Sequence, residues 1–562
     1  MNIIYDVPPV IDKNTFVAID TEWFGIDQTT LHRPTSGKFA CLTVCFDPEI
    51  VYMITDENKV SSALANIDEG IWIGHNIKFD IIHLRRFVNI PPRNKIWDTM
   101  LIDKIMWGGY YDLFGLDDLS RRYLDLYLDK EIQKSFYEDC SSLSEEQKLY
   151  AALDCSITLQ VALKQRKVMD GNDLRIWKDV DRAAMWALMD FRGFRVDVEK
   201  WNVLARLNKQ RQLDIDASLL FNPRSAKVAK EYLTKRGFVK LPNTQEKTLL
   251  AWLYKFPDCE AAEITKQILE SRKYSKRAST YGVKFIEKHL EKEGDIDVIH
   301  CDYWVTGAET GRMSSSSPNM QNIPTKDTRE FRECFIARPG NKLVIGDYSA
   351  QEPGITGYTS KDTQLIEIFN SGEDIYIQAA QRVFNEAIKG KKDPRRKKMK
   401  AIILGLSYGM TEYGLARNEN MSVKEAKALI DRFLRIFSGF KIYMNKQQAN
   451  RRQVRTVLGR KIWLNPYSNQ CERNALNSPI QGTAGDMLKK ALGIMYQNWN
   501  FDYPFACVEI THDEIGFDVP EAIAKEVQSF VNNIMVQVAN EMCPGMKFRA
   551  DVVICDSWAD KE

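Results

Sequence analysis

Four acidic side chains in the first third of the chain have a spacing that suits hydrolysis of a phosphodiester. Asp20 and Glu22 stand two residues apart in TFVAIDTEW, whose composition predicts a strand, so both project from the same face. Asp80 closes the segment HNIKFD, and Asp154 follows Tyr150 by four residues on an expected helix, which puts both on one helical face. Converging carboxylates repel one another unless cations neutralise them, and hard oxygen ligands suit Mg²⁺ or Mn²⁺.

Two such ions close together can activate a water and stabilise the leaving oxygen of a phosphodiester. Tyr150 would orient that water, and Asp98, in WDTM, either supports the site from behind or caps a helix. Taken singly, each aspartate is more simply a helix cap or a surface residue. Together, DTE, NxxxD and YxxxD, in this order, resemble the DEDDy class of 3′→5′ exonucleases. The metal ligands that this resemblance implies are Asp20, Glu22, Asp80 and Asp154.

A second pair of aspartates follows apolar strands in the later half of the chain. Asp347 ends KLVIGD, and Asp513 lies at the turn of the alternating segment CVEITHDEIGFDV (507–519), which predicts a hairpin. A charged residue after a buried strand is often only a turn signal. Here DYSAQE and THDE are similar to the first and third catalytic motifs of family A (polymerase I-like) DNA polymerases.

A basic helix is expected between these two motifs, in RRKKMKAIILGLSYG, with Asp393 as its N-cap and Pro394 as its first residue. Candidate residues recur at every fourth position of this helix. Each step of four residues turns about 40° beyond a full turn, so their side chains form one slanting stripe on the helix surface. The stripe is cationic at its start and bulky at its end, the same polarity as a nucleoside triphosphate. An amphipathic helix with a basic edge is the plainer alternative, and the flanking motifs favour the nucleotide site. The stripe consists of Arg396, Lys400, Leu404 and Tyr408.

The resemblance implies a two-metal polymerase site. Asp347 and Asp513 would bind two Mg²⁺ ions, with Mn²⁺ able to substitute, and the backbone carbonyl of Tyr348 would complete a ligand shell. Lys400 would act as general acid to the leaving pyrophosphate. Glu514 would support the metal site or the primer terminus.

Several positions depart from the family pattern, which usually reads DYSQIELR at the first motif. Glu352 still occupies the steric-gate position, where its bulk would exclude a ribose 2′-hydroxyl, but Pro353 and Gly354 follow it here. Leu404 stands where the family has Phe or Tyr. Tyr376 replaces a His that usually touches the triphosphate, and its hydroxyl could still donate a hydrogen bond.

Three further segments resemble the family over long stretches: 306–324, 455–461 and 471–491. The resemblance implies side chains that sense minor-groove acceptors at the primer terminus, which every correct base pair offers. These are Arg312, Gln481 and His512. Others would hold template or duplex, although Asn beside Pro also suits a turn. These are Arg473, Asn477, Asn319 and Gln321. The basic segment 271–277 fits a thumb that meets phosphates. Its candidates are Lys273, Lys276 and Arg277.

The elements that must carry these residues fall into four expected parts. Residues 1–165 predict an α/β exonuclease domain of RNase H-like fold, with a helix from about Glu145 to Lys164 opened by Ser144 and Gln147 as a capping box. A helical connector (166–195) leads to the thumb and the start of the palm (196–340), and then to the palm and fingers (341–562). The resemblance thus implies an α+β right-hand polymerase of palm, fingers and thumb. Since it begins near residue 15, we expect no 5′-nuclease domain, as in a Klenow-like or phage-type enzyme.

Composition agrees with a soluble, cytoplasmic protein, and the resemblance implies a bacterial cell or a phage-infected host. The 562 residues are 44% hydrophobic and 27% charged, with a net charge of +2, and neither a membrane span nor a secretory signal is evident. The eleven cysteines include no CxxC pair. Cys41 and Cys45 fit buried thiols in a reducing cytosol better than a zinc site.

The function implied is synthesis of DNA on a primer-template from dNTPs, with proofreading, by a protein that we expect to be a monomer. A single-subunit RNA polymerase shares the palm and the stripe-bearing helix, but Glu352 and the exonuclease motifs argue against it. A scaffold with decayed sites would have lost acidic ligands. A stand-alone nuclease would leave two-thirds of the chain without a role.

Overall fold

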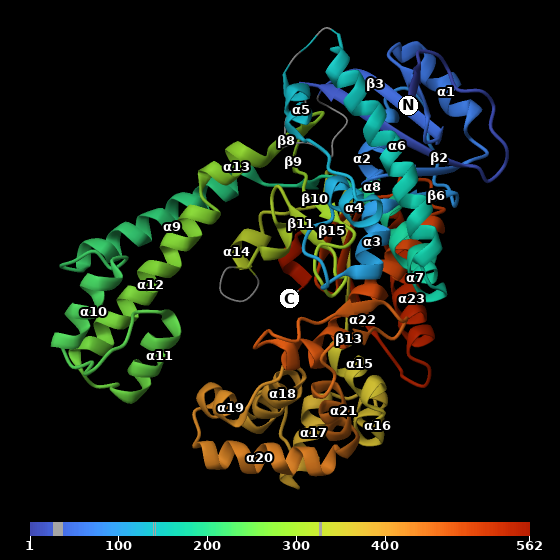
Figure 1. Cartoon of the computed structure of the whole chain (residues 1–562). Helices are drawn as coiled ribbons and strands as arrows, with labels where there is room; N and C mark the ends of the chain where they lie inside the picture. The colour runs from blue at the N-terminus through green and yellow to red at the C-terminus, as the bar shows by residue number, and fades with distance from the viewer. Residues whose placement is uncertain (26–36, 139, 141, 325–328, 562) are drawn as a thin grey trace.

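The computed structural model describes residues 1–25, 37–138, 140, 142–324 and 329–561. In Figure 1 an α/β N-terminal domain (Asn2–Val168) stands above a central sheet, a helical arm (Val198–His289) projects to the left, and a helical lobe (Gln351–Gln448) lies below. The four parts surround the region where the candidate residues of the later half gather. In the described part of the chain, no helix is long and apolar enough to cross a bilayer.

The N-terminal domain is built on a six-stranded sheet in the order β1-β4-β3-β2-β5-β6. Strands β2 and β5 are parallel, as are β5 and β6, whereas β3 runs antiparallel to β2. Most residues of β2 and β3 are buried, because helices pack on the sheet, among them α2 (Lys78–Leu84) and α6 (Glu145–Val168). The strands are β1 Asn2–Ile4, β2 Phe16–Phe24, β3 Lys38–Asp47, β4 Ile50–Ile54, β5 Ile71–Gly74 and β6 Ile96–Asp98.

The long helix α6 begins as predicted. Ser144 accepts a hydrogen bond from the Gln147 backbone, and the Gln147 side chain accepts one from the Ser144 backbone, which is a capping box. The helix then runs past the expected Lys164 to Val168. The other helices of this domain are α1 Val60–Asn66, α3 Thr99–Trp107, α4 Leu116–Leu124 and α5 Glu131–Lys134.

The connector is helical, as expected, and includes one π-helical turn at Trp177–Asp181 between α7 (Gly171–Ile176) and α8 (Arg182–Met189). That turn brings Asp181 against Arg460, whose nitrogens lie 2.6 and 2.9 Å from the carboxylate, and against Lys489 at 2.5 Å. Arg460 also donates to Asp486 at 2.6 Å. All four side chains are buried, so this ionic cluster ties the connector to the central part of the molecule.

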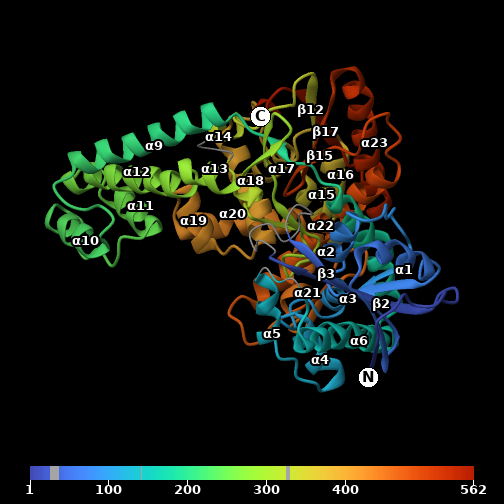
Figure 2. The same ribbon diagram turned by 90° about the horizontal axis from the view of Figure 1, so that it is seen from above.

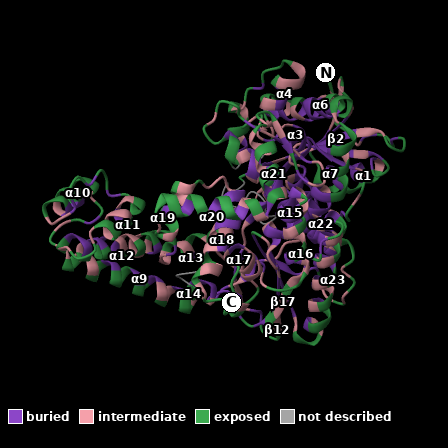
Figure 3. Cartoon of the chain, turned by 90° about the horizontal axis from the view of Figure 1, so that it is seen from below, coloured by how far each residue is buried: buried purple, intermediate pink, exposed green. Residues whose placement is uncertain are grey.

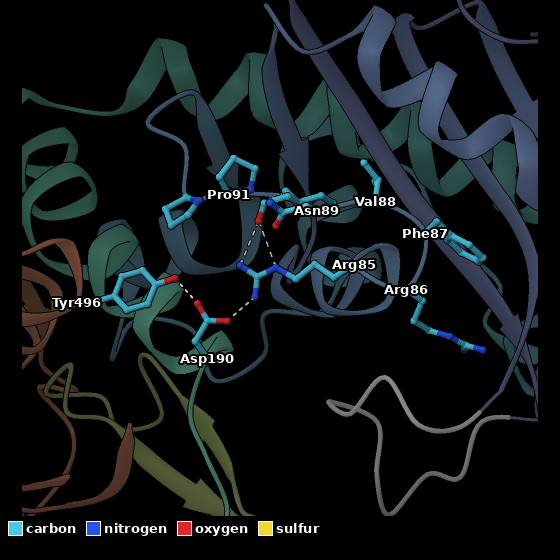
Figure 4. A pocket seen from close by; sticks show the side chains of 10 residues that line it. Arg85, Arg86, Phe87, Val88, Asn89, Pro91, Asp190 and Tyr496 are labelled. Carbon is cyan, nitrogen blue, oxygen red and sulfur yellow. Dashed lines mark hydrogen bonds and ion pairs between the residues drawn. The ribbon is translucent and has the colours of Figure 1, made fainter. Parts of the chain in front are cut away.

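A second joint between the N-terminal domain and the central part is more open (Figure 4). Arg85, just after α2, donates to Asp190 at 2.6 Å and to the carbonyl of Ile90, and Tyr496 donates to the other oxygen of Asp190. Asp190 follows α8, and Tyr496 lies in the last turn of α22 (Cys471–Gln497). The two side chains of this ion pair are 22% and 34% exposed, in contrast to the buried cluster around Asp181.

The central sheet has four antiparallel strands in the order β15-β16-β12-β17. The sequence predicted β12 and the β15–β16 hairpin but not β17, whose residues alternate too weakly between buried and exposed. Helix α23 (Ala524–Met542) packs on β12 and β17, and α22 packs on α23. The strands are β12 Asn341–Tyr348, β15 Cys507–Thr511, β16 Glu514–Pro520 and β17 Ala550–Cys555.

The arm consists of two long antiparallel helices, α9 (Val198–Ser218) and α12 (Glu260–Thr280), which lie side by side in Figure 2. The shorter α10 (Ala226–Lys235) and α11 (Glu246–Lys255) close its far end around a small apolar core of their own. Most of the arm is exposed or intermediate in Figure 3. Helix α13 (Val283–His289) returns the chain to the body.

The helical lobe carries the basic helix expected after Asp393. That residue caps α18 (Pro394–Ser407) by accepting from the Arg395 backbone, and Pro394 is the first helical residue, as predicted. One detail differs: the helix ends at Ser407, so Tyr408 lies just beyond it, because Gly409 adopts a φ of 70° and breaks the helix. The other helices are α15 Gln351–Ser360, α16 Thr363–Asn370, α17 Ile375–Phe384, α19 Glu412–Glu419, α20 Val423–Ile436 and α21 Ser438–Gln448.

Small strands and one short helix, none of them predicted, complete the described structure. They pack at the edges of the larger parts and form two-stranded pairs or a three-stranded sheet. They are β7 Phe194–Arg195, β8 Leu290–Glu293, β9 Ile296–Ile299, β10 Asp302–Trp304, β11 Ser314–Ser316, β13 Gln453–Arg455, β14 Lys461–Trp463 and α14 Arg329–Arg332. Cys41 and Cys45 are buried and free in β3.

Candidate active sites

The acidic residues of the N-terminal domain line one cavity of about 360 Å³, together with Tyr150. They come from three elements: Asp20 and Glu22 from β2, Asp80 from α2 and Asp154 from α6. Residues 134 positions apart in the sequence therefore face the same space. Tyr150 is buried one helical turn before Asp154, on the same face.

Without a cation, burial of these four carboxylates together is costly in free energy. It raises the pKa of Asp20 and Glu22 well above the ordinary range, and their acidic neighbours add to the effect. Burial also raises the pKa of Asp80 and of Asp154 to about 7, although Asp80 accepts hydrogen bonds from the backbone and hydroxyl of Thr21 at 2.9 and 2.7 Å.

The cluster has donor atoms to spare for a metal. One oxygen of Asp20 and one of Asp154 are buried and have no hydrogen-bond partner among the described residues. Such oxygens fit hard divalent cations. Within the described ranges, however, no group of three or more His, Cys, Asp or Glu side chains is already closed around a point that could hold a metal. The carboxylates would have to draw together as an ion enters.

Asp98 is a helix cap, one of the two alternatives that the sequence left open, and it makes a second contact beside α2. It caps α3 by accepting from the Leu101 backbone at 2.9 Å, and it accepts from the Ile77 backbone at 3.0 Å, just before α2. It is fully buried. Asp98 thus fixes the start of the helix that carries Asp80.

The cavity has further walls that the sequence did not predict. They include aromatic and basic side chains, and one of them, Trp304 of β10, comes from outside the N-terminal domain. Its ring nitrogen donates to Ser316 at 3.1 Å. No spacing in the sequence links it to the carboxylates. The other unpredicted lining residues include His75, Phe79, Lys130 and Phe136.

In the central sheet, Asp347 and Asp513 lie side by side because of strand register. Asp347 pairs with Glu514 across β12 and β16, and Asp513 lies in the turn just before Glu514. Burial, followed by the nearby carboxylate of Asp347, raises the pKa of Asp513 to about 7. One buried oxygen of Asp347 has no hydrogen-bond partner in the described part of the chain, so this pair also fits a divalent cation. The Tyr348 side chain is buried and donates to the Met535 carbonyl, and Tyr348 pairs with Ala550 of β17 at the end of β12.

Glu514 is held by side chains that the sequence gave no reason to expect. The Trp558 ring nitrogen donates to it at 2.5 Å, and Arg332 lies 3.6 Å away. Lys561 contacts Glu514 as well and lies 2.9 Å from Asp347. These residues come from α14 and from the segment Trp558–Lys561, which bear no motif.

The stripe of α18 faces partners from the rest of the helical lobe. Arg396 forms an ion pair with Asp374 at 2.6 Å, and its guanidinium lies 5.4 Å from the centre of the Tyr376 ring. Lys400 is exposed, 5.7 Å from the same ring. Leu404 is half-buried one turn further on. Asp374 was not predicted.

Four predicted residues form one hydrogen-bonded chain where the lobe meets the central part. Arg312 donates to Glu352 at 2.8 Å, and the Tyr408 hydroxyl donates to the same carboxylate at 3.0 Å. Gln481 of α22 donates to the Tyr408 hydroxyl at 2.9 Å. The Arg312 guanidinium in turn reaches the Gln481 carbonyl at 3.3 Å. Segments 169 residues apart are thereby linked around Glu352.

The remaining duplex candidates are spread around this centre. His512, exposed at the hairpin turn, has a φ of 59°, and Gln321 donates to the Ile510 carbonyl at 3.4 Å. Asn319 accepts from Ser315 at 3.2 Å, a local contact that is compatible with the turn-forming alternative. Arg473 is exposed on α22, and a buried oxygen of Asn477 lacks a partner among the described residues.

The basic candidates of the arm lie on α12, apart from both carboxylate sites. Lys273 and Lys276 are exposed, as phosphate contacts require. Arg277 is only 8% exposed, and its guanidinium lies 5.3 Å from the Tyr274 ring. A phosphate contact by Arg277 would therefore require its side chain to move.

Comparison with known families agrees with the two sites. Residues 10–170 match the family model described as 3′-5′ exonuclease, and residues 202–560 match that described as DNA polymerase family A. The chain belongs to DNA polymerase family A. The exonuclease match contains all four carboxylates of the N-terminal cavity, and the polymerase match contains both aspartates of the central sheet.

Curated relatives of this family A polymerase carry the name DNA polymerase I. The protein of Pseudomonas aeruginosa is 29% identical over 93% of this chain, and that of Aquifex aeolicus is 27% identical over 98%. The chain spans 96% of the Aquifex protein but 62% of the Pseudomonas protein, and 50% of the relative from Rhizobium leguminosarum.

A solved structure supports the fold. The polymerase domain of Pol1 from M. smegmatis, determined in complex with DNA primer-template and dNTP, matches with a TM-score of 0.82 and 24% identity. The match covers 97% of this chain and 95% of that one. The fold is therefore an exonuclease domain joined to a right-hand polymerase domain.

Proposed function

We propose that this chain is a template-directed DNA polymerase that adds dNTPs to a primer 3′ end and removes mispaired termini with its 3′→5′ exonuclease, in replication or repair. The observation that carries the proposal is the pair Asp347 and Asp513, side by side at one edge of the central sheet, with a separate carboxylate cluster in the N-terminal domain. Two independent sites for phosphodiester chemistry in one chain suit synthesis and its correction.

We assign residues 1–165 to the exonuclease domain, 166–195 to the connector, 196–340 to the thumb and the start of the palm, and 341–562 to the palm and fingers. The proposed partners are primer-template DNA and dNTPs, in the cytoplasm of a bacterial cell or a phage-infected host. The protein is proposed to act as a monomer.

At the polymerase site, Asp347, Asp513 and the Tyr348 carbonyl would hold two Mg²⁺ ions, which supply the charge that activates the primer hydroxyl and stabilises pyrophosphate. The chain's own cations do the rest. Arg396, which donates from two nitrogens to one oxygen of Asp374, would exchange this carboxylate for a phosphate of the incoming nucleotide. Lys400, exposed one turn along α18, would protonate the leaving group.

Selection of the nucleotide would depend on the chain of hydrogen bonds around Glu352. Tyr408 and Arg312 hold its carboxylate in one position, where it would crowd a ribose 2′-hydroxyl. Gln481, Arg312 and His512 would sense the minor groove at the primer terminus. A mispair that shifts the acceptors would weaken these contacts and slow extension.

At the exonuclease site, Asp20, Glu22, Asp80 and Asp154 would hold the metal ions that supply an activated water. Tyr150 would orient that water, because its side chain lies in the cavity one helical turn from Asp154. Asp98 would act indirectly, through the position of α2.

The proposal predicts that the two activities can be removed separately. A 5′-labelled primer on a longer template, with Mg²⁺, is incubated with and without the four dNTPs. We expect Asp154→Ala to lose shortening of the primer and Asp513→Ala to lose its extension, each by at least about a hundredfold, with the other activity retained. Asp47→Ala, at the exposed end of β3, is the matched control and should retain both.

Extension that survives Asp513→Ala would show that the palm assignment is wrong. No extension by the wild type at any metal or salt concentration would favour a nuclease or a DNA-binding scaffold instead.

A further inference from the structure

The segment Trp558–Lys561 folds back onto the central sheet beside the proposed polymerase site. The Trp558 backbone donates to the Phe335 carbonyl at 2.9 Å, and its side chain is fully buried. The Arg332 guanidinium lies 4.0 Å from the Trp558 ring centre. This anchoring fixes where Lys561, three residues later, can reach.

Lys561 reaches the carboxylates. Its ammonium lies 2.9 Å from an oxygen of Asp347 and also contacts Glu514, and its side chain is only 14% exposed. The ammonium lies between two carboxylates, a setting that favours the ordinary positive charge of a lysine. No other Lys or Arg among the described residues has an ion pair with Asp347 in this structure.

We propose that Lys561 is a resident counter-cation of the polymerase site, which neutralises Asp347 before a divalent ion binds and must release that carboxylate when one does. This inference rests on the proposed function. Lys561 is a positioning residue, since it acts through Asp347 and Glu514 rather than on a substrate.

The surroundings of Lys561 make such an exchange feasible. Loss of the Asp347 contact leaves the ammonium paired with Glu514, so no charge is stranded. Glu514 stays in position meanwhile, because Trp558 and Arg332 hold it from the side. The neighbouring carboxylate of Asp551 already has a partner, because it accepts a hydrogen bond from the Ser349 hydroxyl at 2.6 Å. Release therefore requires one ion pair to open and no rearrangement of the sheet.

A direct consequence is competition: Lys561 and a divalent cation bind Asp347 at each other's expense. The test measures binding of Mn²⁺ alone, by electron paramagnetic resonance, to the DNA-free full chain. Asp20→Asn and Asp154→Asn are introduced into every sample, so that the exonuclease carboxylates contribute little. We expect Lys561→Met to bind Mn²⁺ about five- to tenfold more tightly, a typical coupling between two ligands. The Lys561→Arg variant retains the positive charge, so its affinity for Mn²⁺ should be nearly as low as that of the protein with Lys561.

Lys342→Met is the matched control, since it removes an ion pair of 2.7 Å, with Asp556, from the opposite end of β12. It should leave Mn²⁺ affinity unchanged. As a second measurement, the rise in melting temperature from EDTA to Mn²⁺ should be larger for Lys561→Met than for its parent. Lys561→Gln serves if the Met variant does not fold.

The outcomes separate this inference from the proposed function. Asp347→Asn in the same background should abolish the Mn²⁺ site; if the site survives, the metal assignment itself is wrong. If Asp347→Asn abolishes the site but Lys561→Met leaves the affinity unchanged or weaker, the counter-cation role is overturned.

Discussion

At the scale of single residues, partial or full burial of acidic side chains in both sites has a cost in free energy. Burial raises the pKa of Asp80, Asp154 and Asp513 to about 7 each. A buried carboxylate near a second one favours the neutral form unless a cation compensates. The carboxylates of the two sites therefore favour their charged form only when cations lie nearby, whether metals or a lysine such as Lys561.

The role of the Tyr408 hydroxyl can be tested with a single substitution. It donates to Glu352 and accepts from Gln481, so Tyr408→Phe leaves the gate carboxylate held by Arg312 alone. A hydrogen bond to a charged group contributes about 1.5–3 kcal/mol. We expect discrimination against ribonucleotides to fall about tenfold, measured as the ratio of kcat/KM for dCTP to that for rCTP.

The exposed Tyr413→Phe, in the same lobe, is the control for this substitution and should leave the ratio unchanged. An unchanged ratio in Tyr408→Phe would mean that Arg312 suffices to hold the gate.

Sequence reasoning located the charged groups of both sites but not their partners. Asp347 and Asp513 follow apolar strands and lie in recognisable motifs, so their positions were predictable. Lys561 and Asp347 are 214 positions apart, and only the folded chain brings them together. The same holds for Asp374 beside Arg396, since an ion pair between two helices leaves no local pattern in the sequence.

At the scale of elements, Asp98 couples the start of two helices. It caps α3 and accepts from the backbone before α2, and α2 carries Asp80. Asp98→Ala should cost about 1 kcal/mol for the cap, with a further loss for the unpaired backbone group. We expect exonuclease activity to fall ten- to a hundredfold, because misplaced ligands slow the reaction, and primer extension to remain.

Ser422→Ala tests whether this loss is specific. Ser422 caps α20 with a capping box, so its substitution costs a similar free energy of unfolding, in the helical lobe. Exonuclease activity should remain intact in Ser422→Ala. If Asp98→Ala shortens primers at the wild-type rate, the position of α2 does not depend on Asp98.

Local signals explain which elements were predictable. The capping box at Ser144 and the Asp393–Pro394 pair act within one helical turn, and both helices begin where the sequence indicated. The end of α18 was misjudged, although Gly409 was a usable signal for it. Strand β17 was missed because it is held by pairing with β12 rather than by a pattern of its own.

At the scale of the whole molecule, two of the joints that hold the exonuclease domain and its connector to the polymerase differ in character. The cluster around Asp181 is buried, and there burial opposes ionisation of Asp181, but Arg460 and Lys489 outweigh it and keep the pKa of Asp181 below its usual range. The joint at Asp190 is partly exposed to solvent (Figure 4).

Asp181→Ala should therefore destabilise the fold far more than Asp190→Ala. The first leaves two buried cations, Arg460 and Lys489, with Asp486 as their remaining shared carboxylate, and one uncompensated buried charge costs about 3–5 kcal/mol. The second removes a partly exposed pair worth about 1 kcal/mol or less. Urea unfolding of the two variants beside the wild type measures the difference. Equal losses would show that the buried cluster is not the stronger of the two joints.

The arm has two apolar cores, one at each end. Trp201 and Tyr281 belong to the core at its base, whereas Leu233 and Phe238 belong to the separate core at its tip. Helix α12, of 21 residues, spans the distance between them, roughly 30 Å. The aromatic packing at the base of the arm therefore sets the position of its tip. A tilt of about 10° at the base would move the tip by about 5 Å. A small change in side-chain packing at the base would thus move the tip of the arm by more than the diameter of an atom.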